Sequence, residues 1–329
     1  MNCRSNLVDL LLSFLGEEEF VIRFFDLDLE YRVSGRHYFG TGGRMFSFRR
    51  HELEEYWVGI HSTLYRLYSD YLAPARMQDY RDLLREFIDH GYETHSIISF
   101  WRSLNSGSDI SAGRHLILRH DIDLDCGAAK MMHDIEQQVG ARSSFYFRLC
   151  TLDVDLMKQI EQSGSEASYH YEELATLIKR YRISSADEVA DIVKEAQSLF
   201  AVNYRMLKEM TGLPLASVAS HGDFANRAVG IPNHYLLQSQ DLRDCLGIEV
   251  EAYDSKLMAP VVARLSDGLY PMWWNPISPK DVLKRGDSVV YILTHPSRWR
   301  RNIVLRFGED VNRVVEGLKY RLPLSGRNL

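Results

Sequence analysis

Aspartate and histidine side chains follow three short apolar segments of this sequence, each at the point where the segment ends. The segments and the residues after them are 116–118 with Asp121 and Asp123, 217–219 with His221, and 289–293 with His295. Carboxylate and imidazole groups together can bind a divalent metal ion and transfer protons. In α/β barrels the carboxyl ends of the strands carry the active site, so we expect these side chains to lie at one rim.

Asp121 and Asp123 stand two residues apart, which places both carboxylates on the same side of a strand. Like charges this close repel unless a cation or a proton lies between them, and a metal ligand with a general base satisfies that requirement. A calcium loop of the EF-hand type is excluded, because Cys126 and Met132 occupy the positions of its glycine and glutamate. A phosphatase-type aspartate pair would have Thr or Val where Asp125 stands. Asp125 or Asp123 could instead cap the next helix.

Three histidines are candidates for the same centre, each with a structural alternative. His170 lies in the polar segment 164–173, where a histidine can be a metal ligand or an ordinary surface residue. His221 precedes Gly222, which allows the backbone to approach a ligand closely, and it is a candidate metal ligand. His295 stands between an apolar segment and Pro296, as a catalytic acid or as a buried group bonded to the backbone.

Further side chains near these positions are candidates for binding a substrate. Arg119 and Arg227 could hold an anionic group or simply pair with nearby carboxylates. Glu172 and Asp223 could make polar contacts with a substrate. Trp274 could stack on a sugar ring or belong to the core.

Strand and helix patterns alternate along most of the chain, which indicates βα units and a mainly parallel sheet. Strands are predicted at 115–118, 143–149, 216–219, 248–252 and 288–293, and a long helix at 186–210 begins with the capping box of Ser185 and Glu188. The fold class is therefore α/β, as a distorted (β/α) barrel of about six to seven strands over residues 76–329. An open doubly wound sheet is the alternative, although no dinucleotide-binding GxGxxG opens a helix.

Residues 1–75 differ in character and form a smaller, mostly helical accessory region with a short hairpin. Residues 7–15 predict a short amphipathic helix, and the glycines at 40–43 predict a hairpin turn, since the Lys-Ser/Thr of a phosphate loop does not follow them. We expect this region to pack on the barrel or to mediate a homodimer.

The composition is that of a soluble globular protein: 329 residues, 45% hydrophobic and 26% charged, with a net charge of −6. That balance disfavours nucleic-acid binding. The four cysteines contain no CxxC pair, which argues against a structural zinc knuckle. Neither a secretory signal nor a membrane span is recognisable, so we expect a cytoplasmic protein.

Four segments resemble the motifs of the polysaccharide deacetylases, the NodB-homology family. Residues 118–123, Leu-Arg-His-Asp-Ile-Asp, resemble its RHDxD motif. Residues 164–172 resemble the second motif and 220–222, Ser-His-Gly, the third. Residues 293–296, Leu-Thr-His-Pro, followed by Trp299, resemble the last. The resemblance extends over residues 76–305.

The resemblance implies a distorted (β/α) barrel and a metal-dependent hydrolase that removes an acyl group, N-acetyl above all, from a sugar or glycoconjugate precursor in polysaccharide biosynthesis. It implies Asp121 as the general base, Asp123 and His170 as metal ligands, and His295 as the general acid. His221 is the candidate for the third ligand, with Glu172 next. Zinc is the expected ion, with cobalt, nickel or iron as alternatives.

Two positions depart from the family pattern. Leu174 stands where the second motif usually has another histidine, and Ser165 replaces a frequent histidine. Loss of a ligand keeps open a catalytically silent carbohydrate-binding protein, and the same machinery would also suit an amidase acting on a small non-sugar substrate. Typical members are exported, so the missing export signal favours an intracellular substrate such as a nucleotide- or lipid-linked sugar.

Overall fold

The computed structural model describes residues 19–24, 29–34, 37–40, 64–107, 110 and 113–321. Contacts divide the chain into two units, Met1–Leu64 and Tyr65–Leu329. The first contains a three-stranded antiparallel sheet of β1 (Glu19–Phe24), β2 (Leu29–Ser34) and β3 (His37–Gly40). The helix expected at 7–15 and most of the turn expected at 40–43 lie outside the described residues.

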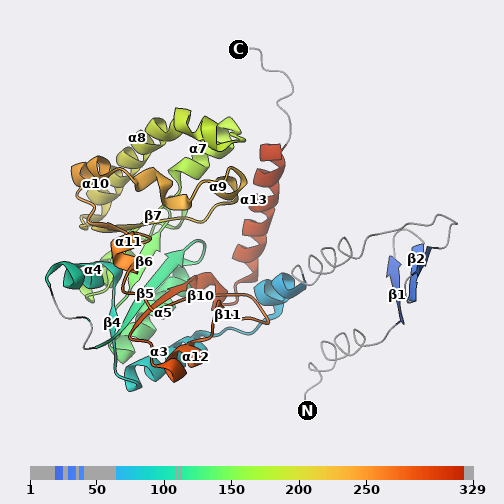
Figure 1. Ribbon diagram of the computed structural model, residues 1–329, viewed down its shortest axis with the longest axis horizontal. Coiled ribbons are helices and arrows are strands. Elements are labelled where there is room, and N and C mark those ends of the chain that lie inside the picture. Colours follow the sequence, from blue (N-terminus) through green and yellow to red (C-terminus); the bar gives the residue numbers. More distant parts are fainter. Residues whose placement is uncertain are drawn as a thin grey trace. The chain divides into compact units, whose positions relative to one another are not determined.

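A curled sheet of nine strands forms the centre of the second unit (Figure 1). The strand order is β11-β10-β12-β5-β6-β7-β8-β9, with β4 beside the first half of β5. All neighbours are parallel except β10 and β11. The bounds are β4 Tyr92–His95, β5 Arg114–Ile122, β6 Ser144–Phe147, β7 Glu166–Tyr171, β8 Ser217–Ser220, β9 Val250–Glu251, β10 Ala263–Asp267, β11 Trp274–Asn275 and β12 Val289–Thr294. The predicted α/β distorted barrel is confirmed, with nine strands where about six to seven were expected.

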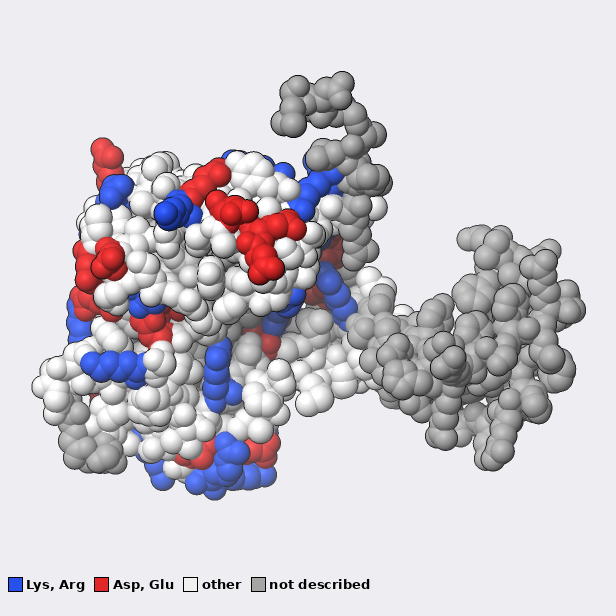
Figure 2. Space-filling view, turned by 45° about the horizontal axis from the view of Figure 1, so that its top comes forward, with Lys and Arg blue, Asp and Glu red and all other residues white. Residues whose placement is uncertain are grey.

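Helices connect the strands, and most of them cover the outer face of the sheet (Figure 1). The α-helices are α3 Met77–Asp89, α4 Ile97–Asn105, α5 Cys126–Val139, α6 Val154–Gln162, α7 Glu173–Tyr181, α8 Ala186–Thr211, α9 Phe224–Ala228, α10 Gln240–Leu246, α11 Ser255–Met258, α12 Pro279–Arg285 and α13 Ile303–Arg321. The buried side chains of α4 and α11 belong to the cluster on the inner face. Within the described residues, none of the helices is long and apolar enough to cross a bilayer. Acidic and basic side chains are mixed over the face seen in Figure 2.

Helix capping agrees with the local sequence signals. The Ser185 side chain accepts a hydrogen bond from the backbone N–H of Glu188 at the start of α8, and Gly212 ends that helix with a φ of 69°. At the start of α5, Asp125 Oδ1 accepts from the N–H of Ala128 at 3.0 Å. Asp125 is therefore the helix cap, which leaves Asp121 and Asp123 available for other roles.

Two segments differ from what their composition suggests. The apolar segment 96–101 has a composition that suggests a strand, but it belongs to α4, with Ser96 as its N-cap. The polar segment that contains His170, where a surface position was one of the two alternatives, is the fully buried strand β7. Its polar groups are bonded internally: Ser144 and Ser217 both donate hydrogen bonds to Glu166. A buried polar strand is stable only with such partners, and the partners come from other strands.

The two faces of the sheet pack into separate clusters of buried side chains. Leu116 and Leu118 of β5 belong to the large cluster beneath the outer helices, whereas Ile117 belongs to the smaller cluster on the inner face. Side chains alternate along a strand, so Arg119 and Asp121 continue the inner face that Ile117 begins. The same alternation places His170 of β7 on that face, because its neighbours Tyr169 and Tyr171 belong to the outer cluster.

Candidate metal centre and active site

Five side chains predicted from the sequence converge where the inner face meets the carboxyl ends of the strands. Strand pairing sets them level, since Thr294 pairs with His120, Asp121 with Tyr146, and His170 with Ala219. The five side chains lie at or just after these paired residues and are close to one another: Asp121, Asp123, His170, His221 and His295. This grouping unites β5, β7, β8 and β12, which lie far apart in the sequence.

Three of these side chains have the arrangement of a metal site. Oδ1 of Asp123 lies 3.4 Å from Nε2 of His170 and 3.6 Å from Nε2 of His221. Ligands held about 2.0–2.2 Å from a tetrahedral ion are about 3.4 Å from one another. Oδ1 is also buried with no hydrogen bond among the described residues. A carboxylate and two imidazoles suit zinc or a similar transition metal, so the side chains fit the metal that the sequence predicts.

Neighbouring groups orient the two imidazoles. Nδ1 of His170 lies 3.0 Å from the carbonyl oxygen of Ala219, which can only accept, so Nδ1 carries the hydrogen and the Nε2 lone pair faces Asp123. Nδ1 of His221 lies 3.5 Å from Oε2 of Glu172. Arg148 donates to both oxygens of Glu172, at 3.1 and 2.7 Å. Glu172 is thus a partner of His221 and Arg148, and not the free substrate contact expected from the sequence.

Asp121 lies beside these groups and is held by Arg119. Two hydrogen bonds, from Nε at 2.7 Å and from Nη2 at 2.8 Å, bind both carboxylate oxygens. Oδ2 of Asp121 is 3.5 Å from Nε2 of His170. The expectation that Arg119 contacts substrate is wrong, because its side chain is completely buried. Its Nε and Nη2 bind Asp121, and its Nη1 donates to the hydroxyl of Tyr291 at 3.4 Å. Its role is to orient the carboxylate and keep it ionised.

His295 is paired with an aspartate that the sequence did not reveal. Asp267, at the end of β10, accepts hydrogen bonds from Nδ1 of His295 at 2.7 Å and from its backbone N–H at 2.8 Å. Trp299 Nε1 also donates to Asp267, at 2.9 Å. The aspartate fixes Nδ1–H, so Nε2 points towards the centre, 4.0 Å from Oδ2 of Asp123. A signal for Asp267 was present, because it ends a short segment in which apolar Ala263 and Leu265 alternate with polar residues.

We expect Asp267→Asn to lower kcat about 100-fold while leaving KM and metal content near the wild-type values. The amide can donate to Nδ1 of His295, which favours the tautomer with its hydrogen on the wrong nitrogen. Steady-state kinetics with metal analysis check this. A proportional loss of metal and activity would show that Asp267 only supports the fold.

The charges in the centre depend on one another. Burial by itself would raise the pKa values of both aspartates. Arg119 outweighs burial at Asp121, and the neighbouring imidazoles of His170, His221 and His295 outweigh it at Asp123, so both pKa values are lowered. Burial would lower the pKa of His170, yet Asp121 and Asp123 raise it. The cluster therefore favours a positive charge between its carboxylates, from a proton or from a metal ion.

The remaining predicted substrate contacts have structural roles or lie apart. Asp223 caps α9 by accepting from Ala225 N at 2.8 Å and pairs with Lys179 at 2.9 Å. Although Glu172, His221 and Asp223 form an overlapping group of donors, these bonds already occupy Asp223. Arg227 is exposed on α9. Trp274 packs against Trp299, with ring centroids 5.7 Å apart, which favours the core role that the sequence left open.

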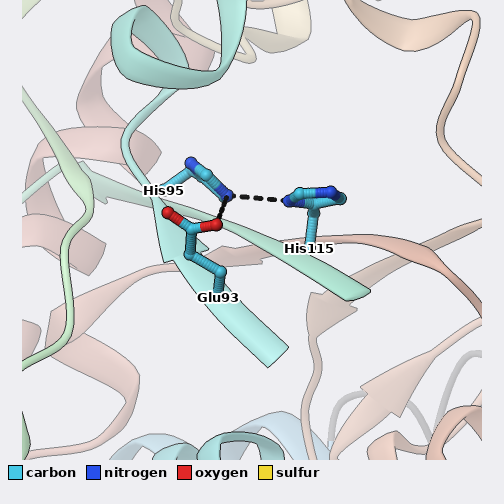
Figure 3. A group of neighbouring side chains, drawn as sticks. All are labelled: Glu93, His95 and His115. Carbon is cyan, nitrogen blue, oxygen red and sulfur yellow. Dashed lines mark hydrogen bonds and ion pairs between the residues drawn. The ribbon is translucent and has the colours of Figure 1, made fainter. Parts of the chain in front are cut away.

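Glu93, His95 and His115 form another group of donor atoms, at the amino-terminal end of the sheet (Figure 3). Nε2 of His95 faces Nδ1 of His115 at 3.0 Å, and Oε2 of Glu93 is 3.8 Å from the same Nε2. Nitrogens facing each other at this distance share a hydrogen, so one donates to the other. This contact does not require an ion, although Nε2 of His115 is buried with no hydrogen bond among the described residues. The pair lies at the opposite end of β5 from Asp121.

Burial lowers the pKa of His95, although Glu93 opposes the shift. A folded-state pKa below the unfolded value means that protonation favours unfolding, so this contribution is complete above about pH 6.5 and is lost as the pH falls below it. We expect the free energy of unfolding to decrease between about pH 7.5 and about pH 5.5, and less steeply in His95→Gln. Urea denaturation at both pH values tests this. An equal change in the free energy of unfolding with pH in the two proteins would contradict it.

No family model matches the chain, and no curated protein matches it. Similar solved structures include two kinds. One is a mutant of BA3943, described as a CE4 family pseudoenzyme with restored enzymatic activity, at 10% identity and a TM-score of 0.34, covering 60% of this chain and 64% of that one. The other is the peptidoglycan deacetylase PdaC from Bacillus subtilis, at 11% identity and a TM-score of 0.30, covering 64% and 98%. This chain spans slightly less than two thirds of the BA3943 structure. At these values the function has to be inferred from the site itself.

Proposed function

We propose that this chain is a metal-dependent hydrolase that removes an acyl group, most simply acetyl, from an amino sugar or a glycoconjugate precursor. The observation that carries the proposal is the position of Asp123 Oδ1 between Nε2 of His170 and Nε2 of His221. An ionised carboxylate and a His–Asp pair flank that position. Those are the groups that hydrolysis of an amide requires on either side of the acyl carbon.

Asp123, His170 and His221 would hold the metal, with zinc as the expected ion. Such an ion supplies a Lewis acid that polarises a carbonyl and makes water more acidic. Asp121 Oδ2 accepts the proton of the water that attacks the acyl carbon, and Arg119 holds that carboxylate in place. His295 Nε2 then donates a proton to the leaving nitrogen as the C–N bond breaks, while Asp267 keeps the other ring nitrogen protonated.

The family motifs favour a sugar substrate, and the structure explains one departure from them. Leu174, at the position of the missing histidine, is buried in the core at the start of α7. His221 supplies a second imidazole from the end of β8 instead. A donor set of three is therefore retained, which argues against a silent carbohydrate-binding protein.

The test is acetate release from N-acetylated amino sugars by protein stripped with a chelator and then reloaded with zinc. We expect activity only in the reloaded protein. Opening of a cyclic ureide, with acetylated sugars left intact, would favour the amidase. Protein that binds no metal and hydrolyses neither substrate would contradict the proposal.

A further inference from the structure

A pocket of about 420 Å³ opens beside the metal centre, between α7 and the end of α13. Its wall is shared with the centre through two side chains. Arg148 Nη1 donates to the backbone oxygen of Asp123 at 3.3 Å, and Glu172 approaches His221. The pocket therefore adjoins the metal centre, and the Arg148–Glu172 ion pair lies between the two.

The pocket is strongly basic in a chain whose net charge is −6. Two carboxylates line it, those of Glu172 and Glu316. Five cationic side chains also line it, so the lining residues carry a net charge of +3. The five are Arg148, Lys179, Arg180, Arg182 and Lys319. A concave site with an excess of one sign concentrates ligands of the opposite sign.

Part of this charge is already paired, and part is available to a ligand. Lys179 bridges Asp223 at 2.9 Å and Glu316 at 3.2 Å. Arg180 and Lys319 are exposed, and neither forms an ion pair with a carboxylate among the described residues. Guanidinium groups match phosphate oxygens in pairs, and a phosphoryl group carries enough negative charge to balance both Arg180 and Lys319, whereas a single carboxylate would balance one of them.

We propose that this pocket binds a phosphoryl or diphosphoryl group of the substrate, so that the acyl sugar at the metal centre is phosphate-linked. This inference rests on the proposed function for the position of the acyl group, but anion binding by the pocket can be measured without catalysis.

The experiment titrates the chelator-treated full-length chain with N-acetylglucosamine 1-phosphate and with the neutral methyl glycoside of N-acetylglucosamine. We expect the phosphate to bind at least about tenfold more tightly, as charge-assisted hydrogen bonds allow. The double variant Arg180→Glu/Lys319→Glu should remove most of that difference. The control Lys158→Glu/Lys280→Glu makes the same change in net charge at exposed lysines on α6 and α12, outside the pocket, and should bind like wild type.

Equal binding of the phosphorylated and neutral sugars would overturn the inference, and so would equal weakening in both double variants. Melting curves of the variants exclude unfolding as the cause. Uridine diphosphate–N-acetylglucosamine and a farnesyl diphosphate-linked sugar, added as further probes, distinguish a nucleotide from a lipid as the source of the phosphate. Pocket-dependent binding without acetate release from zinc-loaded protein would contradict the proposed function alone. Efficient hydrolysis of neutral sugars, unaffected by the pocket variant, would contradict the pocket alone.

Discussion

Asp123→Ala is expected to abolish both zinc binding and acyl hydrolysis. Asp123 is the only carboxylate of the donor group, and it lies within 3.6 Å of Nε2 of both histidines. Without it, two imidazoles remain, which is too few for a stable zinc site. We expect less than one tenth of an ion per chain and a loss of kcat/KM of about 1000-fold or more. Metal analysis after gel filtration and an acetate-release assay give the two values.

A matched control for this variant is Asp89→Ala, which removes an exposed carboxylate at the end of α3. It should retain one ion per chain and full activity. If Asp123→Ala also retains a full equivalent of zinc, the ion is bound elsewhere and the assignment of Asp123 is wrong.

Asp121→Asn is expected to separate metal binding from catalysis. Asparagine has nearly the same shape but cannot take a proton from water, so kcat should fall by about 10²–10⁴-fold while zinc content stays unchanged. The guanidinium of Arg119 would keep a carbonyl acceptor but lose its ionic partner within the protein. A lower melting temperature is therefore also expected, because a buried unpaired charge is costly.

Zinc titration and single-turnover kinetics check this prediction at temperatures below the transition of the variant. Loss of zinc in step with activity would instead identify Asp121 as a ligand. The opposite behaviour of the Asp121 and Asp123 variants is what distinguishes a base from a ligand two residues away.

Local pattern was enough to predict the strands that carry Asp121, His221 and His295. Each of these strands has an apolar run, and Ile117, Arg119 and Asp121 share the inner face by simple alternation. The helix cap at Asp125 and both ends of α8 were also predictable, because caps depend on residues a few positions apart.

Other features of the site depend on hydrogen-bond partners that lie far away in the sequence, so local patterns do not predict them. The strand carrying His170 looks polar in the sequence, but it is buried because its Glu166 and Ser168 have hydrogen-bond partners on β6 and β8. The role of Arg119 changes from substrate contact to support, because its Nε and Nη2 both bind Asp121. Asp267 reaches His295 from a strand 28 residues away, and only the parallel pairing of β10 with β12 brings them together.

The most direct test of the metal centre is anomalous diffraction from zinc-loaded crystals, recorded on both sides of the zinc absorption edge. The structure predicts one strong peak about 2.0–2.2 Å from Asp123 Oδ1 and from Nε2 of His170 and His221. A peak at His95 and His115 instead, or none near Asp123, would contradict it.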